Sequence, residues 1–183
     1  ASSAASDVYK RQGETGTYTL NLTHEAKDEV TVTLSYSGTA KNGEDFIGVT
    51  TVKIPANSSG TTFTIGTIDD KLVEGTENFV VTIVGVSGGK FENLQVDTSK
   101  SSVTTTIVDN DHLPVSSGGA VFGVEDTNYV FAWSDFNVSD PDGNTGLSVT
   151  ISSIPASGTL QFFNGTAWTN VGVGQVVSQA SIE

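Results

Sequence analysis

Acidic side chains gather between the predicted strands of this chain, and they are the residues best suited to chemistry. Asp45 lies in a Gly-rich loop, and the segment 69–77, between two apolar strands, carries four acids. In an antiparallel sandwich alternate loops meet at one end, so we expect Asp45 and the acids after Ile107 to converge with segment 69–77. The gathered acids are Glu14, Asp45, Asp69, Asp70, Glu74, Glu77, Asp109 and Asp111.

Carboxylates that lie close together repel one another unless a cation neutralises them. A Ca²⁺ ion takes about six to eight oxygen ligands, whereas Mg²⁺ prefers fewer protein ligands in a tighter octahedron. Calcium is therefore the first choice for these acids, and magnesium is the second. The alternative interpretation is that the acids are only solvated, because acids are mostly exposed in any protein.

The overall composition narrows the classes of partner. The 183 residues include 21 acids against 8 Lys and Arg, which gives a formal net charge of −13. Nucleic-acid phosphates and anionic membrane surfaces repel such a chain, so both are excluded as partners. The absence of Cys excludes a disulfide framework, a thiol nucleophile and a Cys-ligated metal. No apolar run approaches the roughly 20 residues of a membrane span, so we expect no membrane insertion.

Apolar residues alternate with period two from Thr17 to Ile107, which predicts strands. About seven such strands, separated by turns rich in Gly, Asn, Asp and Ser, are typical of an immunoglobulin-like β-sandwich. We therefore predict one sandwich over residues 13–112.

A second β unit is predicted after an acidic, proline-ended linker at 108–114. Alternation resumes at 129–131 and again between 147 and 162, so residues 113–183 are expected to be β as well. The predicted fold class is all-β, with tandem immunoglobulin-like β-sandwiches. The second is too short to be whole, so we expect it to be truncated, with strands missing after Glu183.

The first residues of the chain are expected to lie outside the fold. Residues 7–12 match the conceptual translation of a transposase end used in sequencing-library preparation. We therefore predict that residues 1–12 are a non-native or disordered leader, a sequencing artefact, and that the native sequence starts at Gly13.

Five motif segments follow one another along the first unit, at 38–40, 43–46, 52–56, 68–79 and 107–111. In this order they resemble a Calx-β domain, which implies a calcium-binding immunoglobulin-like sandwich with Ca²⁺ as its cofactor. The ligands that the resemblance implies are Glu14, Asp45, Asp69, Asp70, Glu74, Glu77, Asp109 and Asp111.

Two departures from the Calx-β pattern bear on these ligands. Asn110 stands in the middle of an otherwise triple-acid end, which lowers the ligand charge. The first strand is truncated or overwritten before Gly13, which makes Glu14 the least secure ligand.

The second unit carries motifs at 125–127, 134–136, 139–143 and 154–160. They resemble the cadherin-like repeats of large bacterial surface proteins, and the junction 109–114 is similar to the calcium-binding linkers between such repeats. The resemblance implies further candidate ligands, although Asp-Pro-Asp-Gly is also an ordinary turn. These candidates are Glu125, Asp126, Asp140 and Asp142.

We expect no enzymatic activity. His24 lies in a polar hairpin and His112 in the linker, and neither is placed between a Ser and an acid as a catalytic triad requires. The acids crowd at a domain end rather than lining an aromatic cleft, which argues against glycoside hydrolysis. Trp133 and Trp168 are either core residues, as strand aromatics usually are, or a platform for stacking sugars.

These observations predict a calcium-binding structural repeat segment of an exported cell-surface adhesin, in which Ca²⁺ stiffens the domain junction. The expected location is extracellular or at the cell surface. The expected partners are neighbouring repeats of the same chain and host or surface glycans or proteins. Two other classes stay open, namely an ancillary carbohydrate-binding module of a secreted hydrolase and the calcium sensor of a membrane exchanger.

Overall fold

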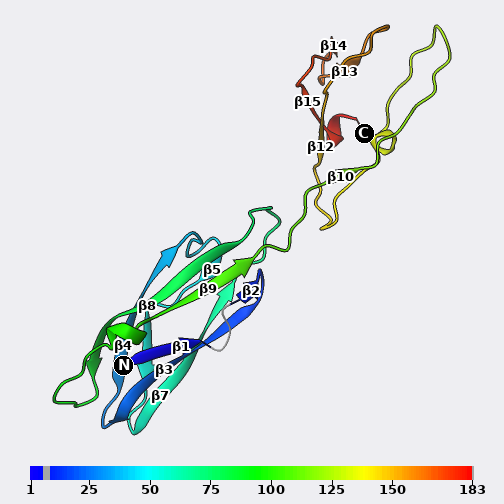
Figure 1. Cartoon of the computed structure of the whole chain (residues 1–183). Helices are drawn as coiled ribbons and strands as arrows, with labels where there is room; N and C mark the ends of the chain where they lie inside the picture. The colour runs from blue at the N-terminus through cyan, green and yellow to red at the C-terminus, as the bar shows by residue number, and fades with distance from the viewer. Residues whose placement is uncertain (6–8, 183) are drawn as a thin grey trace. The chain divides into compact units, whose positions relative to one another are not determined.

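The computed structural model describes residues 1–5 and 9–182, and the chain divides into two compact units, Ala1–Asn110 and Asp111–Glu183 (Figure 1). Nearly all of the regular structure in both units is β-strand, which confirms the predicted all-β class. Among the described residues, no helix has the length and hydropathy needed to cross a membrane.

The first unit is built from two sheets (Figure 1). One sheet has the strand order β1 (Ser2–Ala5), β3 (Thr15–Ala26), β7 (Ser58–Thr67) and β5 (Phe46–Ile47). The other has the order β2 (Tyr9–Arg11), β9 (Ser102–Val108), β8 (Glu77–Gly88), β4 (Val30–Gly38) and β6 (Thr51–Ile54). All neighbouring strands are antiparallel except β2 and β9, which are parallel.

The core of the first unit follows from the alternation in its sequence. In β3 the residues Tyr18 and Leu20 are buried, and in β8 the buried residues are Phe79, Val81 and Ile83. Alternate positions thus face inward from both sheets, as in other sandwiches. Burying one such large apolar side chain stabilises the fold by about 1.5–3 kcal/mol.

One buried hydrogen bond joins the two sheets through the middle of this core. The hydroxyls of Tyr18 in β3 and Thr105 in β9 lie 2.6 Å apart. Both side chains are fully buried, and burial raises the pKa of the Tyr18 phenol while the bond to Thr105 partly offsets that rise. The phenol therefore stays neutral at physiological pH, and each hydroxyl satisfies the other.

Part of the expected leader belongs to the fold. Strand β1 pairs with β3 from Ser2 opposite Asn21 to Ala5 opposite Tyr18, and β2 pairs in parallel with β9. The structure thus describes these stretches as strands rather than as a disordered leader. Residues 6–8 of the expected leader lie outside the described residues. The non-native origin of residues 1–12 stays a prediction.

The second unit has three separate two-stranded sheets and two 3-10 turns. The strand pairs are β10 (Val115–Ser116) with β11 (Val138–Ser139), β12 (Ser148–Thr150) with β15 (Val176–Ser178), and β13 (Gln161–Phe163) with β14 (Trp168–Asn170). The turns are η2 (Trp133–Phe136) and η3 (Gln179–Ser181). Among the described residues of this unit, the buried hydrophobic side chains are Val171 and Val177.

The strand predicted at 129–131 is wrong, because that stretch is irregular. The hydroxyl of Tyr129 donates to Asp135 in η2, and its ring contacts that of Phe131 with centroids 5.1 Å apart. These local contacts take the place of pairing with another strand.

We predict that Tyr18→Phe destabilises the first unit by about 1–3 kcal/mol, because the buried Thr105 hydroxyl loses its partner. Adding Thr105→Val should recover much of the loss, since neither polar group then remains buried. Urea unfolding of the whole chain measures both changes, with Tyr9→Phe at an exposed position as the control. Equal stability of Tyr18→Phe and the parent chain would contradict the role of this bond.

Candidate metal centre

Three of the predicted ligands meet at one end of the first unit. Asp45, Glu74 and Glu77 each place one carboxylate oxygen so that the three oxygens lie within 4.8 Å of one another. Asp45 is buried, Glu77 is half-buried and Glu74 is exposed. This is the only group of three such side chains among the described residues, so the expected convergence of Asp45 with segment 69–77 is found in the structure.

The loop before β5 fixes the Asp45 carboxylate. The backbone N–H groups of Glu44 and Asp45 donate to the carbonyl of Lys41, at 3.2 and 2.9 Å, and close a tight turn. The Asp45 carboxylate in turn accepts from the N–H of Lys41 at 2.6 Å. Phe46, the next residue, stacks on Phe79 with ring centroids 4.2 Å apart, so the core anchors this loop directly.

Glu77 and Glu74 come from the start of β8 and the loop before it. Glu77 opens β8 opposite Ile107 of β9 and shares the strand face of Phe79, two residues later. The loop carrying Glu74 is held by Asp109, whose carboxylate accepts from the N–H groups of Glu74 and Gly75 at 2.7 and 2.8 Å.

Other predicted ligands lie close by but are engaged in local hydrogen bonds. The Asp70 carboxylate accepts from the N–H of Leu72 at 2.9 Å. The Asp69 carboxylate accepts from the side-chain amide of Asn110 at 3.1 Å. Asp69 also packs against Gly13, where an added Cβ would come within 3.3 Å of the Asp69 Cβ.

Glu14 and Asp111 are not members of the three-acid group either. Glu14 accepts from the N–H of Arg11 at 3.0 Å and caps its own turn. Asp111 falls in the second unit, outside the unit that holds the three-acid group. The assignment of all eight acids as metal ligands stays a prediction, and the geometry favours Asp45, Glu74 and Glu77 as its centre.

The electrostatics of the group favour proton or cation binding. The pKa of Glu77 is raised by its burial, then by the charge of Asp45 and by a hydrogen bond with the Asp45 side chain. The pKa of Glu74 is also raised, first by desolvation and then by the charges of Asp45, Asp70 and Asp109. Carboxylates that resist ionisation in this way are relieved when a cation binds between them.

Sequence reasoning did not assign Lys41, whose charge acts on the three-acid group. The Lys41 ammonium partly offsets the rise in pKa of Glu74 and Glu77, and it forms an ion pair with Glu44 at 2.8 Å. The Oδ1 atom of Asn110 is buried and has no hydrogen-bond partner, so it is a candidate neutral ligand.

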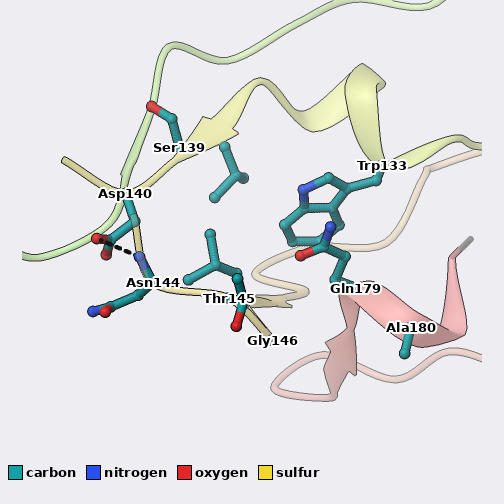
Figure 2. Close-up of a pocket in the computed structure, with 10 residues that line it drawn as sticks. Trp133, Ser139, Asp140, Asn144, Thr145, Gly146, Gln179 and Ala180 are labelled. Carbon is teal, nitrogen blue, oxygen red and sulfur yellow. Dashed lines mark hydrogen bonds between the residues drawn. The ribbon is translucent and has the colours of Figure 1, made fainter. Parts of the chain in front are cut away.

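Two of the four candidate ligands of the second unit, Asp140 and Asp142, lie in one turn, and their role as ligands stays a prediction. Asp140 accepts from the N–H groups of Asp142 and Asn144 at 2.9 and 3.2 Å, and Figure 2 marks the second of these bonds. The Asp142 carboxylate accepts from the N–H of His112 at 2.6 Å. Asp140 and Asn144 also line a cavity of about 460 Å³ beside Trp133, and no residue of the three-acid group lies there. Glu125 and Asp126 are both exposed.

Comparison with known families identifies the first unit. A family model described as the LapA domain matches residues 3–110, which is more than half of the chain. The chain belongs to the LapA domain family. The matched range coincides with the first unit and includes the three-acid group. No curated protein sequence matches the chain.

The solved structures similar to the chain include domains whose descriptions name Calx. The apo form of the Calx CBD1 domain shares 21% identity at a TM-score of 0.45, over 60% of this chain and 96% of that one. CBD12 from CALX1.2 shares 21% sequence identity at a TM-score of 0.45, over 61% of this chain and 46% of that one. The calcium binding domain CBD12 of CALX1.1 shares 20% sequence identity at a TM-score of 0.46, over 65% of this chain and 49% of that one. The matched part therefore spans about half the length of the two CBD12 structures.

The matches bear unequally on the two resemblances. Residues 13–112 resemble a Calx-β domain in their motifs, and the similar solved structures include Calx domains at low sequence identity. The family model that matches the chain is that of the LapA domain. The cadherin-like resemblance of residues 113–183 is tested by none of these matches and stays a prediction, as does the absence of enzymatic activity.

We predict that in calcium-free buffer the LapA domain becomes less stable as the pH rises. The pKa values of Glu74 and Glu77 lie above their ordinary value of 4.5. The folded state therefore holds these protons more tightly than the unfolded state, and the stabilisation present below 4.5 is lost as the pH rises through the raised values. Thermal melts between pH 4.5 and 8 measure this, and Glu77→Gln should flatten the trend. A melting temperature that rises steadily with pH would contradict it.

Proposed function

We propose that the chain is a calcium-binding structural segment of an exported cell-surface adhesin. The observation that carries the proposal is the convergence of Asp45, Glu74 and Glu77 at one end of the LapA domain. Membership of the LapA domain family supports the adhesin-related role.

The chemistry of the donor set favours calcium over other ions. All three side chains offer carboxylate oxygens, which suit a hard cation, and the chain has no Cys for a soft one. The three oxygens lie within 4.8 Å of one another, close enough to share one cation. Ca²⁺ accepts about six to eight oxygens in a flexible arrangement, whereas Mg²⁺ demands a near-ideal octahedron and keeps several waters, so a cluster of carboxylates from two loops and a strand end suits Ca²⁺ better.

The proposed role of the ion is mechanical. Asp109 directly follows β9 and holds the Glu74 loop, and the chain passes from the LapA domain into the linker one residue later. A cation bound at Glu74 would stiffen this end of the domain and, through Asp109, restrict the start of the linker. We propose that calcium in this way stiffens the junction with the next repeat.

We expect calorimetric titration of the whole chain with Ca²⁺ to show at least one binding event. At a calcium concentration about 100-fold above Kd, binding increases the free energy of unfolding by about 2.7 kcal/mol, which raises the Tm of a domain of this size by roughly 10 °C. Asp45→Asn with Glu77→Gln should weaken binding by roughly 100-fold or more, because two charged ligands are lost.

The matched control is Glu25→Gln with Glu92→Gln, which removes the same two charges at exposed positions outside the group. This control should bind calcium as the parent chain does. No heat of binding at millimolar calcium, or equal weakening in both double variants, would mean that the acids are only a solvated surface.

The mechanical role makes a separate prediction. Small-angle scattering of the whole chain should show a more flexible particle in EGTA than in calcium, because repulsion among the unneutralised acids loosens the junction. The Asp45→Asn, Glu77→Gln variant should scatter in calcium as the parent does in EGTA. Identical curves with and without calcium, despite calorimetric binding, would leave the ion site in place and refute the stiffening.

A further inference from the structure

The β13–β14 hairpin of the second unit presents an unusual outer face. Phe163 lies opposite Trp168, and Gln161 lies opposite Asn170. Residues opposite each other, or two apart along a strand, share one face of a hairpin. All four side chains are exposed, whereas the intervening Phe162 and Thr169 are half-buried on the other face.

Two aromatic rings lie on this solvent-facing side. Trp168 is 60% exposed and Phe163 is 45% exposed, with ring centroids 5.6 Å apart. Of the two interpretations of Trp168, the structure of this chain favours the exposed platform over the core residue. Tryptophan that faces water and packs against a second ring on a short hairpin is typical of a binding surface, because it offers apolar area with little rotamer freedom to lose.

Two amide side chains lie on the same face as the aromatic pair, one step farther from the hairpin turn. The Gln161 side-chain amide donates to the Asn170 side-chain carbonyl at 2.9 Å. Each amide carries one acceptor and two donor hydrogens, so this mutual bond uses only part of their capacity. The hairpin thus offers flat apolar rings next to flat, neutral hydrogen-bonding groups.

The charge of the region selects the chemistry of the partner. Residues 143–182 contain no Asp, Glu, Lys, Arg or His, although the whole chain has a net charge of −13. An uncharged face complements an uncharged ligand. Nucleic acids and acidic glycans would meet only the repulsion of the rest of the chain, and a cationic ligand would find no ion pair here.

We propose that this face binds a neutral polysaccharide. A pyranose ring has an apolar C–H face that can stack on the Trp168 indole, and hydroxyl groups that can donate to and accept from amides. The Gln161–Asn170 pair lies next to the rings, where the hydroxyls of a stacked sugar chain would reach. This site is separate from the LapA domain and does not need calcium.

The test uses the whole chain titrated with cellohexaose, laminarihexaose and mannohexaose, followed by tryptophan fluorescence and calorimetry. At least one neutral hexasaccharide should bind, and Trp168→Ala should weaken it by roughly tenfold or more, because the stacking contact is lost. Gln161→Ala should weaken binding by a smaller factor. Phe122→Ala is the matched control, since Phe122 is a 90% exposed aromatic elsewhere in the same unit.

Three outcomes would overturn the proposal. The first is no binding of any of the hexasaccharides, and the second is equal binding by Trp168→Ala and the parent chain. The third is that Trp168→Ala abolishes self-association in sedimentation velocity, or binding to phosphatidylcholine vesicles, while no sugar binds. Glycan binding should be unchanged in EGTA and in the Asp45→Asn, Glu77→Gln variant. A failure of the glycan proposal can therefore be distinguished from a failure of the calcium proposal.

Discussion

The contact between Phe46 and Phe79 is the interaction on which the candidate site depends. The two rings stack at 4.2 Å between the two sheets, and each follows a ligand candidate closely in sequence. Asp45 directly precedes Phe46, and Glu77 lies two residues before Phe79 on the same strand face. The ring contact therefore sets the distance between the two carboxylates. The hydrophobic core holds together two like charges that would separate in a less well-packed fold.

Much of the LapA domain was predictable because its strands alternate cleanly. The apolar positions of β3, β4, β6, β7, β8 and β9 are visible in the sequence, and so is the convergence of Asp45 with segment 69–77. The roles of Glu14 and Asp109 were not visible, because sequence spacing does not show which backbone N–H groups a carboxylate will accept from. An acidic side chain in a loop can accept hydrogen bonds from backbone N–H groups as readily as it can bind an ion.

The second unit shows where periodicity stops being informative. Alternation at 129–131 predicted a strand, yet the Tyr129 hydroxyl bonds to Asp135 in a nearby 3-10 turn. The alternation of Leu160 and Phe162 predicted a strand where β13 is found, but the side of the hairpin that faces solvent depends on contacts outside the pattern. With few buried side chains in this unit, the inward face is weakly specified by hydrophobicity alone.

The double hydrogen bond from the Glu74 loop to Asp109 has a kinetic meaning. Because two consecutive N–H groups donate to Asp109, the backbone at Glu74 and Gly75 is held by the protein's own contacts. An arriving cation then has to order little more than the Glu74 side chain, so most of the entropy of assembling the site is lost when the protein folds. The proposed calcium site is therefore partly preorganised, and a cation that binds there would not have to wait for this loop to refold.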